Sequence, residues 1–265
     1  MKQHGIWCVI PVYNNAGTVM ETVSRVRDFG IGVLVVDDGS TDADLCVLLS
    51  SMEDVVVIRH ARNRGKGEAL KTALDYLSRQ EASHMITMDA DGQHNPEDIP
   101  AFMDAVRNDP DAVWVGTREF EKSAAPGSSR FGRRFSNMWF KIETGRDCPD
   151  TQSGFRAYPV QLIRQLKLSG RHYEFEMEIL VKAAWAGLEI KSLDVSVYYP
   201  DPSERVSHFK PFTDNCRISL MHAGLVGRRL LPIPHKRLFK REKNYSIELL
   251  RRPGAFFKML LKENA

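Results

Sequence analysis

Two aspartates separated by one alanine form the pattern in this sequence with the clearest chemical use. The run Asp89-Ala90-Asp91-Gly92-Gln93-His94 directly follows the apolar residues 85–88. Carboxylates two residues apart, just beyond a buried strand, can both reach one cation, and their hard oxygens suit Mg²⁺ or Mn²⁺. Gln93 can add a neutral oxygen, and His94 is a weaker candidate ligand. The alternative is an acidic loop that caps a helix, because an Asp-x-Asp triplet alone is common by chance.

A second pair of carboxylates lies in the run Asp37-Asp38-Gly39-Ser40-Thr41-Asp42, which follows the apolar residues 33–36. Such a pair at a strand end can accept hydrogen bonds from a nucleobase imide or from ribose hydroxyls, and we predict this role for Asp38. Gly39 permits a tight turn. For Asp42 we favour a structural role as the cap of the next helix. The alternative for the whole run is a turn followed by a helix cap.

A basic, glycine-rich turn lies between these two acidic runs. It reads Arg62-Asn63-Arg64-Gly65-Lys66-Gly67 and opens a helix, which makes Lys66 and its neighbours candidates for binding a phosphate or a nucleotide. The turn lacks the GxxxxGK[ST] spacing of a P-loop, and no GxGxxG follows the first strand. These absences argue against a kinase-type NTPase and against a dinucleotide dehydrogenase.

Short apolar runs that alternate with helix-period segments position these loops. Because near-continuous apolar strands alternate with helices, we predict an α/β fold with a parallel, doubly wound sheet covered on both faces. Ligands of such sheets bind beyond the carboxyl ends of the strands, which is where the unusual residues fall. We expect a loop over residues 123–134. The predicted strands are 6–10, 33–36, 55–58, 85–88 and 112–115, with one or two more in 188–199, and the predicted helices are one through Val19, Val23 and Val26, then 68–79, one that starts at Pro96, and 174–185.

Composition and charge limit the class of protein. Of the 265 residues, 43% are apolar and 27% charged, which is ordinary for a globular chain. The four cysteines have no metal-ligand spacing, which fits a reducing cytoplasm. No signal peptide is visible before the first strand, and the longest uncharged apolar stretch of the tail is 218–227, too short for a spanning helix. We therefore expect a cytoplasmic protein.

The end of the chain is basic and amphipathic. After residue 200 there are 14 Lys/Arg against 6 Asp/Glu, whereas the preceding part is mildly acidic. Short apolar clusters flanked by Lys and Arg are typical of helices that lie in a membrane interface, so we predict peripheral contact through 215–265 with the inner face of the cytoplasmic membrane, and no nucleic-acid partner. A helix that covers the core, a dimer contact and a solvated extension are the alternatives.

Six motifs in order resemble family 2 glycosyltransferases of the GT-A fold, and most closely the polyprenyl-phosphate (dolichyl-phosphate) sugar synthase branch. The resemblance covers roughly residues 5–210, which we expect to form the catalytic domain, with 211–265 as the amphipathic basic extension. One departure is Asn15, where the branch often has Glu; Glu21 could substitute. The motifs are Val9-Ile10-Pro11-Val12-Tyr13-Asn14, Val35 to Asp42, Asn63 to Gly67, Asp89 to Pro96, Gly116-Thr117-Arg118, and Asp150-Thr151-Gln152-Ser153-Gly154-Phe155-Arg156.

The resemblance implies roles for individual residues. Asp89, Asp91 and Gln93 would hold the metal, Mg²⁺ or Mn²⁺. Asp89, Arg118 and Asp150 would act in catalysis, with Arg118 on a phosphate of the donor or acceptor and Asp150 as base or acceptor organiser. His208 and Lys210 belong to a segment that closes over the donor. The residues expected to bind the nucleotide sugar are Pro11, Tyr13, Asn14, Asp38, Lys66, Asp89, Ala90, His208 and Lys210.

The expected activity is metal-dependent, inverting transfer of a sugar from a UDP- or GDP-sugar to a membrane-associated acceptor such as a polyprenyl phosphate. An alcohol acceptor would need a general base such as Asp150, whereas a phosphate acceptor would need only orientation, by Arg118, Arg130, Arg133 or Arg134. The alternatives are a transferase acting on a soluble or another lipid or glycan acceptor, a sugar nucleotidyltransferase, and an inactive nucleotide-sugar-binding module.

Overall fold

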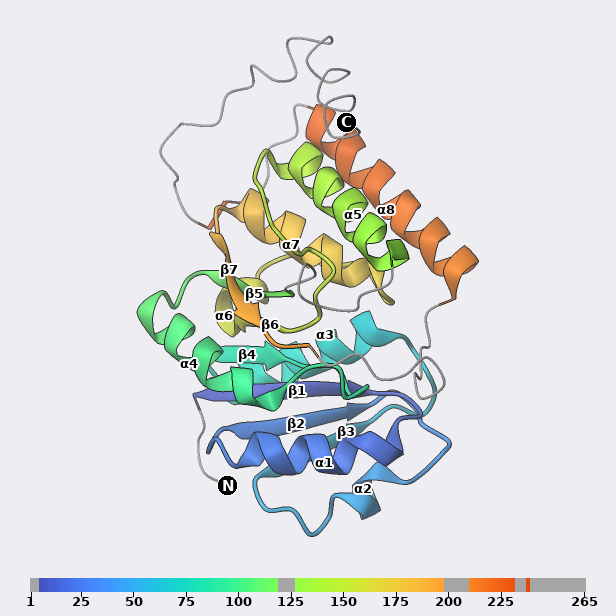
Figure 1. Ribbon diagram of the computed structural model, residues 1–265, viewed down its shortest axis with the longest axis vertical. Coiled ribbons are helices and arrows are strands. Elements are labelled where there is room, and N and C mark those ends of the chain that lie inside the picture. Colours follow the sequence, from blue (N-terminus) through green and yellow to red (C-terminus); the bar gives the residue numbers. More distant parts are fainter. Residues whose placement is uncertain (1–4, 119–126, 198–209, 232–236, 239–265) are drawn as a thin grey trace.

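A seven-stranded mixed sheet organises the computed structural model, which describes residues 5–118, 127–197, 210–231 and 237–238 (Figure 1). The strand order is β3-β2-β1-β4-β6-β5-β7, and every neighbouring pair is parallel except those that involve β6. The predicted α/β fold is confirmed, with one antiparallel strand added. The strands are β1 (Ile6–Val12), β2 (Gly32–Asp37), β3 (Val55–Arg59), β4 (His84–Thr87), β5 (Val113–Arg118), β6 (Arg156–Pro159) and β7 (Ile190–Val195).

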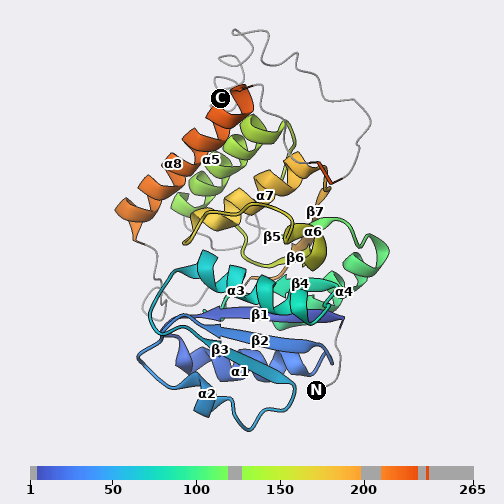
Figure 2. The ribbon, with the colours of Figure 1, turned by 180° about the vertical axis from the view of Figure 1, so that it is seen from behind.

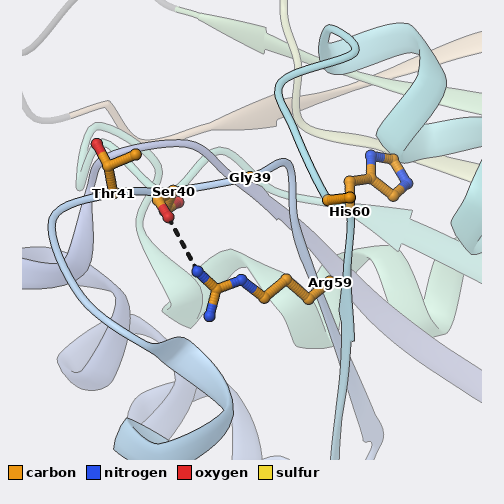
Figure 3. Close-up of a pocket in the computed structure, with 6 residues that line it drawn as sticks. Gly39, Ser40, Thr41, Arg59 and His60 are labelled. Carbon is orange, nitrogen blue, oxygen red and sulfur yellow. Dashed lines mark hydrogen bonds between the residues drawn. The ribbon is translucent and has the colours of Figure 1, made fainter.

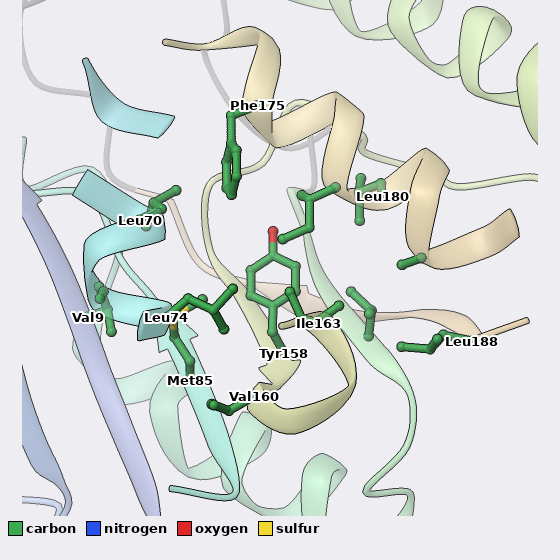
Figure 4. Packing of buried hydrophobic residues seen from close by; sticks show 14 of the residues in the cluster. Val9, Leu70, Leu74, Met85, Tyr158, Val160, Ile163, Phe175, Leu180 and Leu188 are labelled. Carbon is green, nitrogen blue, oxygen red and sulfur yellow. The ribbon is translucent and has the colours of Figure 1, made fainter. Parts of the chain in front are cut away.

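Helices cover both faces of the sheet because successive strand residues point to opposite sides. Cys8 and Ile10 of β1 pack with α1, α2 and α4 on one face. Trp7 and Val9 pack with α3, α5, α6 and α7 on the other (Figure 4). The helices are α1 (Ala16–Arg27), α2 (Leu45–Leu48), α3 (Lys66–Arg79), the 3₁₀ turn η1 (Pro96–Asp98), α4 (Ile99–Asn108), α5 (Gly127–Thr144), α6 (Val160–Ile163), α7 (Glu174–Ala186) and α8 (Pro211–Leu230).

The second half of the chain differs from the sequence expectation at the start of α5 and at β6. The loop expected over 123–134 is wrong from residue 127 onward, because these residues form the first turns of α5. Helix α5 packs against both α7 and α8, which also contact each other, and both views show α5 and α8 side by side (Figures 1 and 2). Tertiary packing therefore stabilises a helix that glycine and serine disfavour locally.

Helix α8 is attached to the rest of the protein by buried polar contacts. His222 Nδ1 lies 2.7 Å from Glu143 Oε1 of α5, and the His222 ring stacks on Trp139. Leu225 of α8 enters the core next to α7. A boundary at residue 210 stays a prediction, and α8 begins at Pro211. Within the described part of the chain, none of the helices has the length and apolar character that a membrane span requires.

Candidate functional site

The loops after β1, β2 and β4 meet at one edge of the sheet, as parallel strands require. Asn14 has a φ of 51°, donates its backbone N–H to Ser40 Oγ and accepts from the Thr41 N–H, so it ties the first loop to the second. Thr18 of α1 donates to the Ala90 carbonyl. These contacts fix the relative positions of the predicted nucleotide-binding residues Asn14 and Ala90, and Pro11 and Tyr13 lie half-buried beside them.

Asp42 caps a different helix from the one expected. Its Oδ2 accepts a hydrogen bond from the Ala16 N–H, the first residue of α1, at 2.9 Å. The following helix, α2, is capped instead by Asp44, which accepts from the Cys46 and Val47 N–H groups. The expectation that Asp42 caps the next helix is therefore wrong in its partner, because the β2–α2 loop folds back over the start of α1.

The Asp38 side chain fixes the basic turn by accepting hydrogen bonds from its backbone. Its side chain is almost fully buried, with Oδ1 2.6 Å from His60 Nδ1 and 2.9 Å from the Arg64 backbone N, and Oδ2 2.7 Å from the Gly65 N. His60 Nε2 contacts Thr72 Oγ1 of α3. Both carboxylate oxygens therefore bind the protein and fix the loop that presents Lys66. Contact between Asp38 and a nucleobase stays a prediction.

A pocket of about 350 Å³ opens beside this turn (Figure 3). Arg59 Nη2 donates to the Ser40 carbonyl across it, and the guanidinium also contacts Asp37 and Asp44. Gly39 can take no side chain here, because it has a φ of 77° and a Cβ would lie 2.5 Å from the Arg62 backbone. The pocket is lined by Gly39, Ser40, Thr41, Arg59, His60 and Ala61.

Lys66 forms a bridge between two carboxylates at the centre of the site. Its Nζ lies 2.6 Å from Asp89 Oδ1 and 3.0 Å from Glu176 Oε1, a residue of α7 that the sequence did not single out. Burial alone lowers the pKa of Lys66, but the two carboxylates raise it above its usual range. Burial likewise raises the pKa of Asp89, whereas Lys66 lowers it below the usual value. Lys66 is therefore held as a cation.

Gly154 lies directly against this bridge. A Cβ at this position would approach Asp89 Oδ2 to 2.5 Å and Lys66 Nζ to 3.1 Å. Thr87 of β4 donates to the Gly154 carbonyl, which fixes the backbone there. The glycine between Asp150 and β6 therefore provides the space in which the Asp89 carboxylate sits.

Asp91 and the residues after it complete the acidic loop. Burial and the nearby charge of Asp89 raise the pKa of Asp91. Asp91 Oδ1 accepts from the Gln93 N–H at 3.0 Å. His94 is buried against Phe155, and its Nδ1 accepts a hydrogen bond from the Asp89 backbone N. Burial lowers the pKa of His94, which favours the neutral imidazole.

The chemistry of this loop fits a divalent cation. Two carboxylates raise each other's cost of ionisation, and a cation between them would relieve that repulsion. In the part of the chain that the structure describes, no three His, Cys, Asp or Glu side chains are arranged to hold a metal by themselves. Mg²⁺ is usually bound through one or two carboxylates, with the remaining positions taken by substrate phosphates and water. Asp89, Asp91 and Gln93 are the residues that would hold it.

Arg118 of β5 forms an ion pair with the buried Asp150. Arg118 Nε lies 2.6 Å from Asp150 Oδ2 and Arg118 Nη2 lies 2.8 Å from Oδ1, a bidentate arrangement. Asp150 is 0% exposed. Arg133 of α5 donates to the Arg118 carbonyl, which brings a second guanidinium to this part of the site. His208 lies outside the described residues, and Lys210 is exposed at the start of α8.

Comparison with known proteins agrees with this geometry. Residues 7–166 match the family described as "Glycosyl transferase family 2". An uncharacterized protein of Methanocaldococcus jannaschii is 30% identical over 75% of this chain and 83% of its own length. The UDP-N-acetylglucosamine–dolichyl-phosphate N-acetylglucosaminyltransferase of Methanococcus voltae is 27% identical over 75% of this chain and 87% of its own length. Further relatives include dolichol-phosphate and undecaprenyl-phosphate mannosyltransferases.

Solved structures share the fold. Glucosyl-3-phosphoglycerate synthase of Mycobacterium tuberculosis superposes with a TM-score of 0.62 at 18% identity, covering 85% of this chain and 80% of that one. At this identity the likeness establishes the GT-A fold alone, and the family match and the relatives carry the assignment. The chain therefore belongs to glycosyl transferase family 2, where it is most similar to the polyprenyl-phosphate sugar synthase branch.

Proposed function

We propose that this glycosyltransferase moves one sugar, with inversion, from a UDP- or GDP-sugar to the phosphate of a polyprenyl phosphate at the inner face of the cytoplasmic membrane. The observation that carries the proposal is the buried Arg118–Asp150 pair, with Arg133 beside it, next to the Lys66–Asp89 bridge. Arg118 and Arg133 thus bring positive charge to the part of the site that holds Asp150. The named relatives that act on dolichyl or undecaprenyl phosphates support this acceptor class.

Asp150 is poorly suited to deprotonating an alcohol. It is fully buried, and Arg118 occupies both of its oxygens. A general base must reach the proton that it removes, and a phosphate acceptor needs no such base because it is already anionic at neutral pH. The arrangement therefore favours a phosphate acceptor, which the positive charge of arginine side chains can orient. Asp150 then acts by holding Arg118 in place.

The proposed reaction forms one bond and breaks one. An oxygen of the acceptor phosphate attacks the anomeric carbon, and the bond from that carbon to the β-phosphate oxygen breaks, with its electron pair leaving on the nucleoside diphosphate. A divalent cation at Asp89 and Asp91 would neutralise charge on that leaving group. Lys66 supplies a fixed positive charge at the same place, and Asp38 holds the turn that carries it.

The donor and acceptor can be tested together. Incubation with Mn²⁺ and a panel of nucleotide sugars is expected to release UDP or GDP, with the greatest rate when undecaprenyl phosphate is supplied in vesicles. Phosphoglycerate serves as the soluble phosphate acceptor for comparison. Absence of release from every donor, with and without lipid, would contradict the proposal. Release of pyrophosphate from a nucleoside triphosphate and a sugar phosphate would instead indicate a nucleotidyltransferase.

An exposed apolar face on α8 supports peripheral membrane contact. Of the seven large hydrophobic side chains that are exposed in the described residues, five lie on α5, on α8 or directly after it. At 3.6 residues per turn Phe212 and Leu230 point the same way, and Leu220 lies within about 80° of them. Arg217 and Arg228 are exposed along one edge of this face, about 60–80° around the helix from Leu220, where they can contact anionic headgroups. The same α5 that borders it carries Arg133 to the site.

Replacing Phe212 and Leu220 together with serine is expected to reduce binding to anionic phospholipid vesicles at least about fivefold, because these side chains are 83% and 74% exposed and would lose their apolar contact with the lipid. Cosedimentation measures the effect. The matched control is Met20→Ser with Val47→Ser, two exposed apolar residues on the opposite side of the sheet, and it should bind as wild type does. Undiminished binding of the α8 variant would refute docking through this face.

A further inference from the structure

The Lys66 ammonium contacts the same Asp89 carboxylate that a bound divalent cation would contact. Its Nζ lies 2.6 Å from Asp89 Oδ1, and Asp89 is one of the two carboxylates proposed for the metal. The same Nζ lies 3.0 Å from Glu176 Oε1. Two carboxylates, of Asp89 and Glu176, thus contact one ammonium group. A second cation can enter only by sharing or displacing the contact between Lys66 and Asp89.

The backbone around Lys66 leaves its side chain little freedom to withdraw. Gly65 has a φ of 99° and packs against Arg171 and His172, where a Cβ would lie 2.3 Å from His172 Nδ1. Asp38 fixes the Gly65 N–H, and Gly154 closes the side next to Asp89. Lys66 is therefore anchored at the first residue of α3, between two anions and not between an anion and solvent.

Glu176 provides the second anion from an independent element. It lies in the first turn of α7, and its side chain is only 14% exposed. Its neighbour Phe175 is buried against Gly67, so α7 and the start of α3 keep their spacing. The carboxylate is thus held beside Lys66 whether or not Asp89 is engaged elsewhere.

We propose that Lys66 competes with the divalent cation for Asp89, and that Glu176 is a positioning residue that holds Lys66 when the cation takes Asp89. The inference rests on the proposed metal site. In the absence of the cation, Lys66 neutralises Asp89 and keeps the acidic loop in place. When the cation binds, Lys66 keeps its contact with Glu176 and remains beside the donor diphosphate as a second positive charge.

Competition of this kind predicts that substitutions of Lys66 and of Glu176 change the affinity for Mn²⁺ in opposite directions. Lys66→Met removes the competing charge, so Mn²⁺ should bind about tenfold more tightly. Glu176→Gln leaves Lys66 with Asp89 as its partner, so Mn²⁺ should bind several-fold more weakly. If Glu176 acts through Lys66, Glu176→Gln should change the affinity less than about twofold in the Lys66→Met background. If the charges acted independently, Glu176→Gln would weaken Mn²⁺ binding equally in the wild-type and Lys66→Met backgrounds.

The test is a Mn²⁺ titration of the full chain without nucleotide, in which electron paramagnetic resonance measures the free ion. It is carried out on the wild type, on both single variants and on the double variant. Lys66→Gln repeats the first substitution with a polar side chain, in case Lys66→Met folds poorly. Lys71→Met is the matched control, because Lys71 lies on the same helix and pairs with Glu68 away from the site. Its Mn²⁺ affinity should equal that of wild type.

The outcomes separate the two levels of the proposal. Tighter binding by Lys66→Met or Lys66→Gln, together with a Glu176 effect that disappears in the double variant, supports the competition. Unchanged or weaker Mn²⁺ binding by both Lys66 variants overturns it. Equal weakening by Glu176→Gln in both backgrounds overturns the role of Glu176. If neither wild type nor any variant binds Mn²⁺, the metal site of the proposed function fails, and the competition fails with it.

Discussion

Asp91→Asn is expected to reduce the rate of sugar transfer by about a thousandfold without disturbing the fold. Negative charge develops on the nucleoside diphosphate as it leaves, and its stabilisation is usually the largest single contribution to such a reaction. Of the two carboxylates in the acidic loop, Asp89 forms a salt bridge with Lys66, whereas burial and the charge of Asp89 raise the pKa of Asp91. An amide at this position keeps an oxygen but loses the charge that attracts the cation.

The loop itself should tolerate the substitution. Asp91 Oδ1 accepts a hydrogen bond from the Gln93 N–H, and an asparagine oxygen can accept the same bond. Burial and Asp89 raise the pKa of Asp91, so in the metal-free protein stability is lost as the pH rises through that raised pKa and the carboxylate ionises. Asparagine does not ionise, so the variant avoids this loss of stability. The Tm of Asp91→Asn at neutral pH and without metal should therefore equal or exceed that of wild type.

Turnover with Mn²⁺, Mn²⁺ affinity and Tm are the three measurements. Asp104→Asn is the matched control, because Asp104 is an exposed aspartate of α4 that pairs with Arg107 away from the site. It should change turnover less than about twofold. Turnover by Asp91→Asn within tenfold of wild type would show that Asp91 does not hold the metal. A large fall in Tm would show that the residue acts through the fold.

Sequence patterns located the central strands and the edge at which the site lies. Parallel strands covered on both faces are apolar at nearly every position, so residues such as Val33 to Val36 stand out from their surroundings. Because strand ends share one edge, the carboxylates that follow these runs could be placed together without any long-range information. The structure brings these loops to one edge: the Asn14 N–H donates to Ser40 Oγ, and Thr18 of α1 donates to the Ala90 carbonyl.

Strand β6 could not be recognised in the same way. It begins with Arg156, a charged residue that looks exposed in the sequence but is fully buried. The guanidinium is accommodated because it donates to the carbonyls of Thr151, Ser153 and Glu176. All three acceptors depend on the folded chain, so no local pattern indicates that an arginine can start a central strand.

Glu176 shows why part of the site escaped prediction. In the sequence it is one of several glutamates at the start of a helix, where acidic residues are common because they stabilise the helix terminus. Its contact with Lys66 joins residues 110 positions apart. The contacts of Asp38 within the protein were likewise not visible in the sequence: His60 and two backbone N–H groups bind its oxygens, and its predicted contact with a nucleobase stays a prediction.

Arg118→Met is expected to lower both turnover, by at least about a hundredfold, and the free energy of unfolding, by about 3 kcal/mol. Asp150 is fully buried and bound by two nitrogens of Arg118. Removing the guanidinium leaves a buried carboxylate without that partner, which costs far more than a surface ion pair contributes. Urea unfolding and nucleoside diphosphate release with a polyprenyl phosphate acceptor measure the two effects.

The double variant Arg118→Met with Asp150→Asn separates stability from acceptor binding. Asparagine removes the buried charge, so most of the lost stability should return, as happens when both members of a buried pair are replaced. Turnover should remain low, because no guanidinium is present at residue 118 to orient the acceptor phosphate. If turnover recovers together with stability, Arg118 acts only by balancing Asp150, and the acceptor phosphate must be bound elsewhere. If stability recovers alone, the pair has two separable functions: Asp150 positions the guanidinium, and Arg118 binds the acceptor.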